Sequence, residues 1–453
     1  MKRRPHTTGA IRAPFAGSSL AALASIAALV ALASTALLPS CSAGSDPGPL
    51  PPAVPDEIVI TVDDSHFRPA LELSGAATVR VDYGDGSDPL VLSAAAGVRE
   101  LADRVFADGA GEHEVSLVVT PWSALTVLNC GFRAGDGGNN TAATDVPVIG
   151  FHPPTTASGF ENPYATPSRT AMREYVGTVT AIDGIQAATH LVALCIEWQA
   201  VDTIDCSNMT RLRSLEAFLS DVKSHSFQNC PALRRCCLES TGANSSWRIE
   251  GGVRVESASL DLRDSPSLQD IRGSGDDHDG LILHPSALGP LWHLCKMGNW
   301  RMQAVTIGDE TPAPIDLTRF AALSECWISS SPVIDEVEFV GGALHSMWLT
   351  SCGVRSIDIR DNDHLDEIDA ANNPIESIGI AGCDGLRRLV FRDCGLDADT
   401  VDYLLAYMDS LGVVSGTEYP FTVDLGGTNA APSATGLARA EALRARNWAV
   451  TTN

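Results

Sequence analysis

The stretch from Leu344 to Leu396 decides the fold of this chain: LHSMWLTSCG, VRSIDIRDNDH, LDEIDAANNP, IESIGIAGCDG, LRRLVFRDCG and a final L. Its units begin at positions 344, 354, 365, 375, 386 and 396, so steps of ten and eleven alternate and two units make a period of about 21 residues. Each unit has the form L-x-x-L-x-L-x-x-N/C, with apolar residues at its first, fourth and sixth places. A fixed period of this kind is typical of a solenoid, in which stacked coils bury their apolar residues against their neighbours.

The same register extends far upstream, and it predicts about ten coils of about 21 residues between 191 and 396. Units begin at positions 191, 201, 212, 222 and 233, at 257 and 268, and at 291, 302, 323 and 334. The motif and its period resemble those of leucine-rich repeats. Three stretches interrupt the pattern and are expected to form loops or distorted coils on one face: 240–256, 273–290 and 308–322.

The segment 1–41 has the organisation of an export signal. Four basic residues precede the uncharged run SLAALASIAALVALASTALL, which ends in L-P-S-C at Cys41. A basic start, an apolar stretch and a short cleavage region are typical of a secretory signal. The cysteine resembles the acylated residue of bacterial lipoproteins, so 1–40 is expected to be a lipoprotein signal peptide and Cys41 the lipid-bearing N-terminus. A retained transmembrane helix is the alternative, because the apolar run is long enough to cross a bilayer.

The charge of the chain disfavours two kinds of partner. It has 56 acidic and 31 basic residues, with a formal net charge of −25 at pH 7. Binding to nucleic acid needs basic contacts to phosphate, and attraction to an anionic membrane surface also needs basic residues. We therefore expect no nucleic-acid partner and contact with the membrane only through the lipid anchor. A solvated, self-repelling exterior accounts for the charge without any partner.

The chain between the anchor and the repeats is expected to contain a tether and a small domain. The segment 41–55 is rich in proline and small residues, which is typical of a flexible tether. The stretches EIVITV, ATVRVDYGDGSDPLVL and EHEVSLVV alternate apolar and polar residues, which predicts an antiparallel β-sandwich over 56–125. The turn at 82–87 resembles the YGDG hairpin of PKD-like domains. The segment 126–190 is then expected to form a connector and N-terminal cap.

The remaining segments complete a fold that is mainly β with short helices. We expect the solenoid over 191–397 and an α/β cap over 398–453, with a helix at about 433–446 that covers the open end of the array. The order of signal, sandwich, repeats and cap resembles leucine-rich-repeat surface lipoproteins of Bacteroidota. The resemblance implies an outer-membrane or cell-surface location and a binding or adhesion role, without a defined substrate.

Twelve cysteines in an exported chain would suggest disulfides, but their positions follow the repeat. Four of them occupy the N/C place of their units: Cys230, Cys352, Cys383 and Cys394. Cys195 and Cys237 fall in one outward column but two coils apart, which is roughly 9.6 Å and too far for a bridge. We therefore expect buried, inert thiols.

The sequence contains no recognisable catalytic motif. G-x-S-x-G, H-E-x-x-H and the P-loop pattern are all absent, so enzymatic activity is not expected. One candidate Ca²⁺ site is the loop GSGDDHDG at 273–280, with Asp276, Asp277 and Asp279 as oxygen ligands. A solvated acidic loop is the simpler interpretation. Turn formation likewise explains a second candidate at least as well: Asp82, Asp85 and Asp88. No other cofactor is expected.

The candidate binding surface is an outward column at the fifth place of the later coils. Strand side chains alternate between faces, so the residues there point away from the core: Trp327, Trp348, Asp369 and Val390. The two tryptophans would form an exposed aromatic strip flanked by charged residues: Glu325, Glu367, Arg388 and Arg392. Exposed apolar patches often mark binding surfaces, and paired rings can stack on sugars or peptide side chains. The alternative is that an inserted loop, such as 308–322, covers both rings.

These patterns favour a membrane-anchored, non-enzymatic protein that binds a protein or glycan ligand in adhesion or recognition. A second hypothesis is a structural or assembly partner of an envelope complex that faces the periplasm. The third is a glycan-active enzyme, which requires a deep pocket with two carboxylates about 5–10 Å apart.

Overall fold

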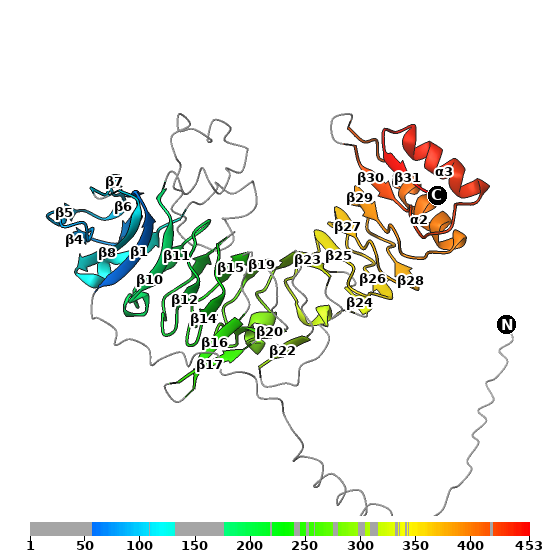
Figure 1. Cartoon of the computed structure of the whole chain (residues 1–453). Helices are drawn as coiled ribbons and strands as arrows, with labels where there is room; N and C mark the ends of the chain where they lie inside the picture. The colour runs from blue at the N-terminus through cyan, green and yellow to red at the C-terminus, as the bar shows by residue number, and fades with distance from the viewer. Residues whose placement is uncertain are drawn as a thin grey trace, which may run out of the picture. The chain divides into compact units, whose positions relative to one another are not determined.

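The computed structural model describes residues 57–131 and 176–453, apart from short gaps at 108, 218–219, 240–244, 251–252, 258, 275–279, 298–303, 309–315, 331–333, 335, 340–341, 343 and 417–419. These residues belong to one compact unit, Pro49–Asn453. They are mainly β, with two α-helices (Figure 1). None of the helices in this part of the chain is long and apolar enough to cross a bilayer. The expected signal, Cys41 and the tether lie outside the described residues, as do Asp276, Asp277 and Asp279.

The N-terminal strands form a five-stranded antiparallel sheet in the order β10-β1-β8-β4-β5. Its members are β1 (Ile58–Asp64), β4 (Ala77–Asp82), β5 (Leu90–Ala94), β8 (Gly111–Thr120) and β10 (Val179–Asp183). The alternation expected from the sequence is confirmed, because Val79 and Val81 on β4 and Val115 and Leu117 on β8 are all buried. The turn after β4 requires glycine: Gly84 has φ +66°, and a Cβ there would lie 2.4 Å from the backbone oxygen of Glu114.

The other N-terminal strands belong to the long sheet that continues through the repeats. These are β3 (Ala70–Leu73), β6 (Gly97–Glu100) and β9 (Leu125–Asn129). Strands β2 (His66–Phe67) and β7 (Arg104–Val105) form a separate two-stranded sheet. Strand β9 pairs antiparallel with β3 and parallel with β11 (Ala193–Cys195). The inward side chains of both sheets form one buried core. The N-terminal strands and the repeats therefore share a continuous hydrogen-bonded sheet.

The repeats form a β-solenoid with coils of about 21 residues. Each coil adds one parallel strand to the long sheet: after β11 come β13 (Ser214–Glu216), β15 (Arg235–Glu239), β19 (Asp270–Ser274), β21 (His293–Met297), β23 (Glu325–Ser329), β25 (Ser346–Thr350), β27 (Glu367–Asp369) and β29 (Arg388–Val390). Glu325 pairs with Ser346, Ser346 with Glu367, and Glu367 with Arg388, so each partner lies one full coil further along the chain. The total of about ten coils stays a prediction, because several gaps in the description fall within the array.

The intervening units build shorter sheets on the opposite side of the coils. The first contains β12 (Thr203–Asp205), β14 (Ser224–Ser226), β16 (Ser245–Glu250) and β17 (Val253–Ser257). The second contains β18 (Ser259–Leu262), β20 (Gly280–Leu283) and β22 (Ala304–Ile307), and the third β24 (Glu336–Glu338), β26 (Ser356–Asp358) and β28 (Ser377–Gly379). Strands β16 and β17 pair antiparallel, so the first expected interruption, 240–256, contains a β-hairpin.

The N/C place of each unit holds the turns of neighbouring coils together. Asn373 is buried, its side-chain amide donates to the backbone oxygens of Leu349 and Ala370, and its Oδ1 accepts from the backbone N–H of Cys352 at 2.9 Å. In a cysteine-bearing unit the Cys352 thiol donates to the oxygen of Ile328 at 3.4 Å. The side chains at the N/C place therefore provide hydrogen-bond partners for backbone groups of the adjacent coil, and these bonds fix how one coil stacks on the next.

The C-terminal cap extends the long sheet and adds both helices. Strands β30 (Thr422–Asp424) and β31 (Ala449–Thr451) continue the parallel order beyond β29. Helix α3 (Ala434–Arg444) lies within the expected range and is capped by the Ser433 side chain. Helix α2 (Ala398–Ser410) packs against α3 and is capped by Asp397, whose carboxylate accepts from the backbone N–H of Thr400. It is an addition to the single helix, at about 433–446, that the sequence predicted for the cap.

The cysteines behave as the repeat predicts. All eleven from Cys130 to Cys394 are buried. Burial raises the pKa of the Cys130 and Cys230 thiols to about 12, so these groups are protonated at neutral pH and are poor nucleophiles.

We predict that Asn373→Ala lowers the free energy of unfolding by about 2–4 kcal/mol, because it leaves buried backbone groups of two coils without hydrogen-bond partners. Urea unfolding followed by circular dichroism measures the change. The matched control is Glu376→Ala in the same coil. Glu376 is exposed and pairs with exposed Arg355, so the change there should stay within about 0.5 kcal/mol. Equal losses in the two variants would contradict the assigned role of Asn373.

Candidate functional site

The two tryptophans of the expected aromatic strip lie side by side on the long sheet. Trp327 on β23 pairs directly with Trp348 on β25, and their ring centroids are 5.5 Å apart at an interplanar angle of 28°. Both side chains are partly exposed among the described residues, and residues 309–315 of the loop that was expected as a possible cover lie outside them. Their neighbours Cys326 and Met347 are buried. The structure therefore places both rings on the outward face of the sheet, and their role in binding stays a prediction.

Other side chains hold the tryptophan pair on both sides. The His293 ring lies edge-on to Trp327, with centroids 5.7 Å apart. The Arg388 guanidinium lies over the Trp348 ring, 5.4 Å from its centroid. A sugar that stacks on that same face of Trp348 therefore has to displace Arg388.

Hydrogen bonds connect the strip across four neighbouring strands. The indole N–H of Trp327 donates to Ser346 Oγ at 2.7 Å, and this hydroxyl donates to Glu367 Oε1 at 2.7 Å. Arg388 Nη2 donates to Asp369 Oδ2 at 2.7 Å. Five of the seven expected binding residues are thus brought together, namely Trp327, Trp348, Glu367, Asp369 and Arg388. Sequence reasoning missed Ser346, although alternation also places the third residue of each unit on the outward face.

The other two expected residues have different surroundings. The carboxylate of Glu325 lies 3.8 Å from His293 Nε2, at the side of the strip nearer β21. Arg392 Nε donates to Asp424 Oδ2 at 2.8 Å, and Asp424 belongs to β30 of the cap. Arg392 is therefore paired with a residue of the cap, and no described contact connects it to the tryptophan pair.

A buried ionic column continues from the strip along the third places of the preceding coils, and Glu216 joins it from the fifth place of its unit. Arg235 Nε lies 2.9 Å from Glu216 Oε1 and 3.4 Å from Asp270 Oδ2. Asp270 Oδ1 also lies 2.8 Å from His293 Nδ1. All four of these residues are buried. The signal for this column was present in the sequence as polar residues at equivalent places of four units: Ser214, Arg235, Asp270 and His293.

The surroundings of Asp270 keep its carboxyl group ionised. Burial opposes ionisation, but the hydrogen bond with His293 and the charges of His293, Arg272 and Arg235 outweigh it and lower the pKa of Asp270 to about 2. A carboxylate in this position connects two arginines and a histidine from three strands.

We predict that the ionic column makes stability depend on pH in acid. The pKa of Asp270 lies below the ordinary 3.8, so its stabilising contribution is complete above about pH 4 and is lost as the pH falls towards 2. Between about pH 5 and pH 2 the wild type should lose about 2 kcal/mol more of its free energy of unfolding than the Asp270→Asn variant. Urea unfolding across this pH range measures both. Parallel pH profiles would contradict the assignment.

Two of the three aspartates in the acidic turn at 82–88, Asp82 and Asp85, make internal contacts. Asp82 pairs with Arg80 at 3.0 Å, and Asp85 accepts from Arg104 Nε at 3.0 Å. Burial of Asp85 is outweighed by hydrogen bonds from Ser87 and Arg104, which lower its pKa to about 2. Asp82 and Asp85 also accept from the backbone N–H groups of Gly84 and Ser87, and these bonds within the turn support turn formation as the reason for the two aspartates. Among the described residues, no group of three or more His, Cys, Asp or Glu could hold a metal ion.

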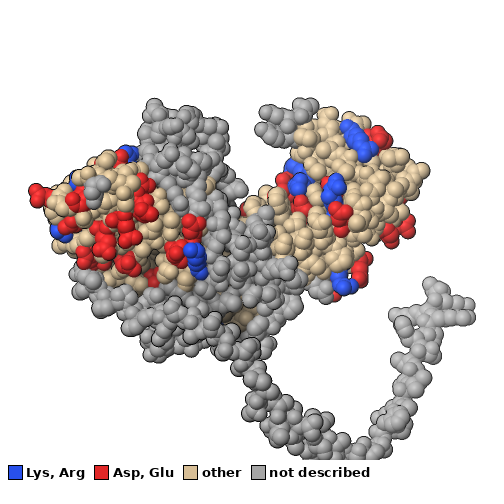
Figure 2. Space-filling view, viewed as in Figure 1, with Lys and Arg blue, Asp and Glu red and all other residues tan. Residues whose placement is uncertain are grey.

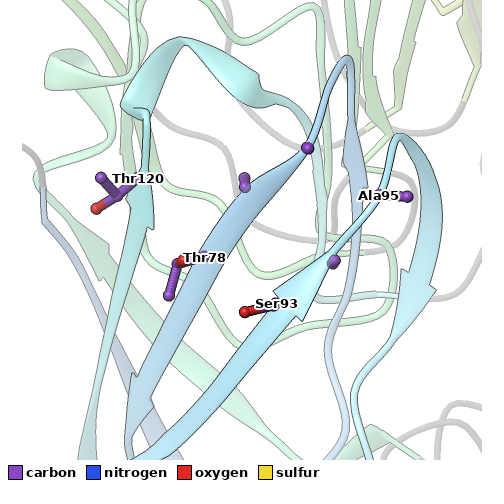
Figure 3. A pocket seen from close by; sticks show the side chains of 7 residues that line it. Thr78, Ser93, Ala95 and Thr120 are labelled. Carbon is purple, nitrogen blue, oxygen red and sulfur yellow. The ribbon is translucent and has the colours of Figure 1, made fainter.

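A hollow of about 500 Å³ lies at one end of β4, β5 and β8 (Figure 3). It is lined by small, uncharged residues: Ala76, Ala77, Thr78, Ser93, Ala94, Ala95 and Thr120. The hollow therefore does not supply the paired carboxylates that the glycan-active enzyme hypothesis requires.

No protein-family model matches this sequence, and comparison with curated proteins finds no significant match. The class of the chain therefore rests on its register and its structure, which define a β-solenoid repeat protein.

Proposed function

We propose that this chain is a cell-envelope-anchored, non-enzymatic binding protein whose outward sheet face recognises a protein or glycan ligand. We further propose that it is a leucine-rich-repeat lipoprotein of the Bacteroidota type, with a PKD-like N-terminal domain. The observation that carries the binding role is the partly exposed pair Trp327 and Trp348 on adjacent strands of a continuous parallel sheet.

The rigidity of the strip supports a role in recognition. The backbone of β23, β25, β27 and β29 is hydrogen-bonded from coil to coil, and the Ser346 and Arg388 contacts hold the outward side chains. Groups that are already ordered lose little entropy when a ligand binds. Tryptophan and arginine are also the residues that most often dominate binding energy at protein interfaces.

The contacts of the tryptophan pair favour a protein ligand over a glycan. Arg388 lies over Trp348 and Trp348 packs against Trp327, so ring faces that a sugar would use are shared with neighbouring side chains. The carboxylates of Glu325 and Glu367 flank the rings and can accept hydrogen bonds from a polypeptide. A glycan ligand is the second outcome that a binding assay must test.

Lipid anchoring through Cys41 would hold the binding domain at the envelope, with 42–55 as the tether. Support comes from the basic, apolar and cysteine-terminated leader. Stable anchoring takes at least two membrane-binding signals, and the two acyl chains of a diacylated cysteine provide them.

We predict that protease added to intact cells removes the repeat domain, as expected for a surface-exposed lipoprotein. Immunoblotting of the repeat domain measures the loss, and a periplasmic protein serves as the control for leakage. Full protection until the envelope is permeabilised would favour the alternative, a periplasm-facing structural or assembly partner of an envelope complex.

We predict that the double variant Trp327→Ala/Trp348→Ala binds its ligand at least about tenfold more weakly in protein and glycan panels, because the central aromatic contacts are lost. The matched control is Tyr403→Ala, which removes an exposed ring from α2. Unchanged binding by the tryptophan variant, or an equal loss in both variants, would exclude the strip as the binding surface.

A further inference from the structure

Three consecutive N-terminal strands lie at sheet edges. In the described part of the chain, β5 is the last strand of the five-stranded sheet and β6 the last strand of the long sheet. Strand β7 pairs with β2 in a two-stranded sheet. An edge strand carries backbone N–H and C=O groups that point away from its partner and can pair with another chain.

The edge formed by β5 lacks the usual protection against such pairing. The run PLVLSAAAGV at 89–98 contains no charged residue, although 19% of the chain is charged. Val91 on β5 is 60% exposed and Val98 on β6 is 46% exposed. Soluble proteins commonly protect their edges with charged side chains, proline or bulges, and β5 itself, LVLSA, has neither proline nor a charge.

The sheet face beside this edge has room for incoming side chains. Thr78 pairs with Ser93 on one side and with Thr120 on the other, so short side chains form a row across β5, β4 and β8. This row lines the hollow of about 500 Å³ (Figure 3). Longer side chains of an added strand can therefore lie over the hollow without displacing residues of the sheet.

The charges of the domain indicate which partner fits. Acidic side chains gather over the N-terminal strands (Figure 2), and exposed Asp63, Glu112 and Glu114 lie on β1 and β8. The sheet order β1-β8-β4-β5 places these carboxylates at least two strands away from the edge. A basic partner would find no carboxylate on β5. Two copies of this acidic chain, in contrast, can pair along β5 without a carboxylate on either paired strand, and Asp82 on the adjacent β4 is paired with Arg80 at 3.0 Å.

We propose that β5 pairs antiparallel with β5 of a second copy of the chain and joins the two five-stranded sheets across a two-fold axis. Identical strands that pair antiparallel form a self-complementary interface, as two-fold symmetry requires. Backbone hydrogen bonds supply the pairing, and the exposed Val91 side chains lie close to the axis on the outer face. The interface is separate from the tryptophan strip and does not depend on the proposed ligand.

Sedimentation of the full chain in detergent solution, over a concentration series, tests the proposal. We expect a reversible monomer–dimer equilibrium in the wild type. Val91→Lys should weaken dimerisation at least tenfold, because it brings two ammonium groups together near the axis. The matched control is Val414→Lys, at a cap residue that is 64% exposed, and it should dimerise like the wild type. Circular-dichroism melting checks that both variants remain folded.

Hydrogen exchange identifies the interface. The backbone amides of 90–94 should become protected as the concentration of wild-type chain rises, and Val91→Lys should remove this effect. A chain that stays monomeric throughout overturns the proposal, as does a dimer that is insensitive to Val91→Lys. Protection of 90–94 that appears only when a different protein is added also overturns it.

Discussion

The stacking of one coil on the next is the constraint on which this structure depends. A single coil cannot enclose its leucine-type residues, so each is stable only against its neighbours. Asn373 shows how the register is held: one buried amide group bonds to backbone atoms from successive coils. Cys352 makes a similar but weaker contact through its thiol. Both residue types satisfy polar groups inside a tight turn, where water cannot reach.

The same stacking organises the outer surface. Because every coil adds one parallel strand, side chains at equivalent places form columns that run along the sheet. The fifth-place column contains the tryptophan pair and, in an earlier coil, Glu216. The third-place column contains Arg235, Asp270 and His293, and Arg235 links Glu216 to Asp270. His293 contacts both, since it bonds to Asp270 and lies against Trp327. The proposed binding surface and the stability of the middle coils are therefore physically connected.

The sequence predicted the elements that follow from the 21-residue repeat. It missed the elements that depend on contacts between the repeats and segments outside them. The repeat period identified the solenoid and the outward position of Trp327 and Trp348. It did not indicate that β9 pairs with β3, which makes the N-terminal strands part of the long sheet. Helix α2 was also absent from the expected tail. Ser346 was not predicted, because a single serine forms no recognisable sequence pattern. Its hydrogen bonds are to Trp327 on one neighbouring strand and to Glu367 on the other.

The sequence by itself determined the coil length, the buried face and the residues that point outward, because strand alternation and a fixed period are local properties of the chain. Only the tertiary structure decided which outward groups engage one another. Arg388 donates a hydrogen bond to Asp369 and lies over the Trp348 ring, whereas Arg392 donates to Asp424 of the cap. The physical reason is that ion pairs and ring contacts depend on distances between strands that are a full coil or more apart in the sequence. The packing of the coils sets these distances, and they cannot be predicted from a local pattern in the sequence.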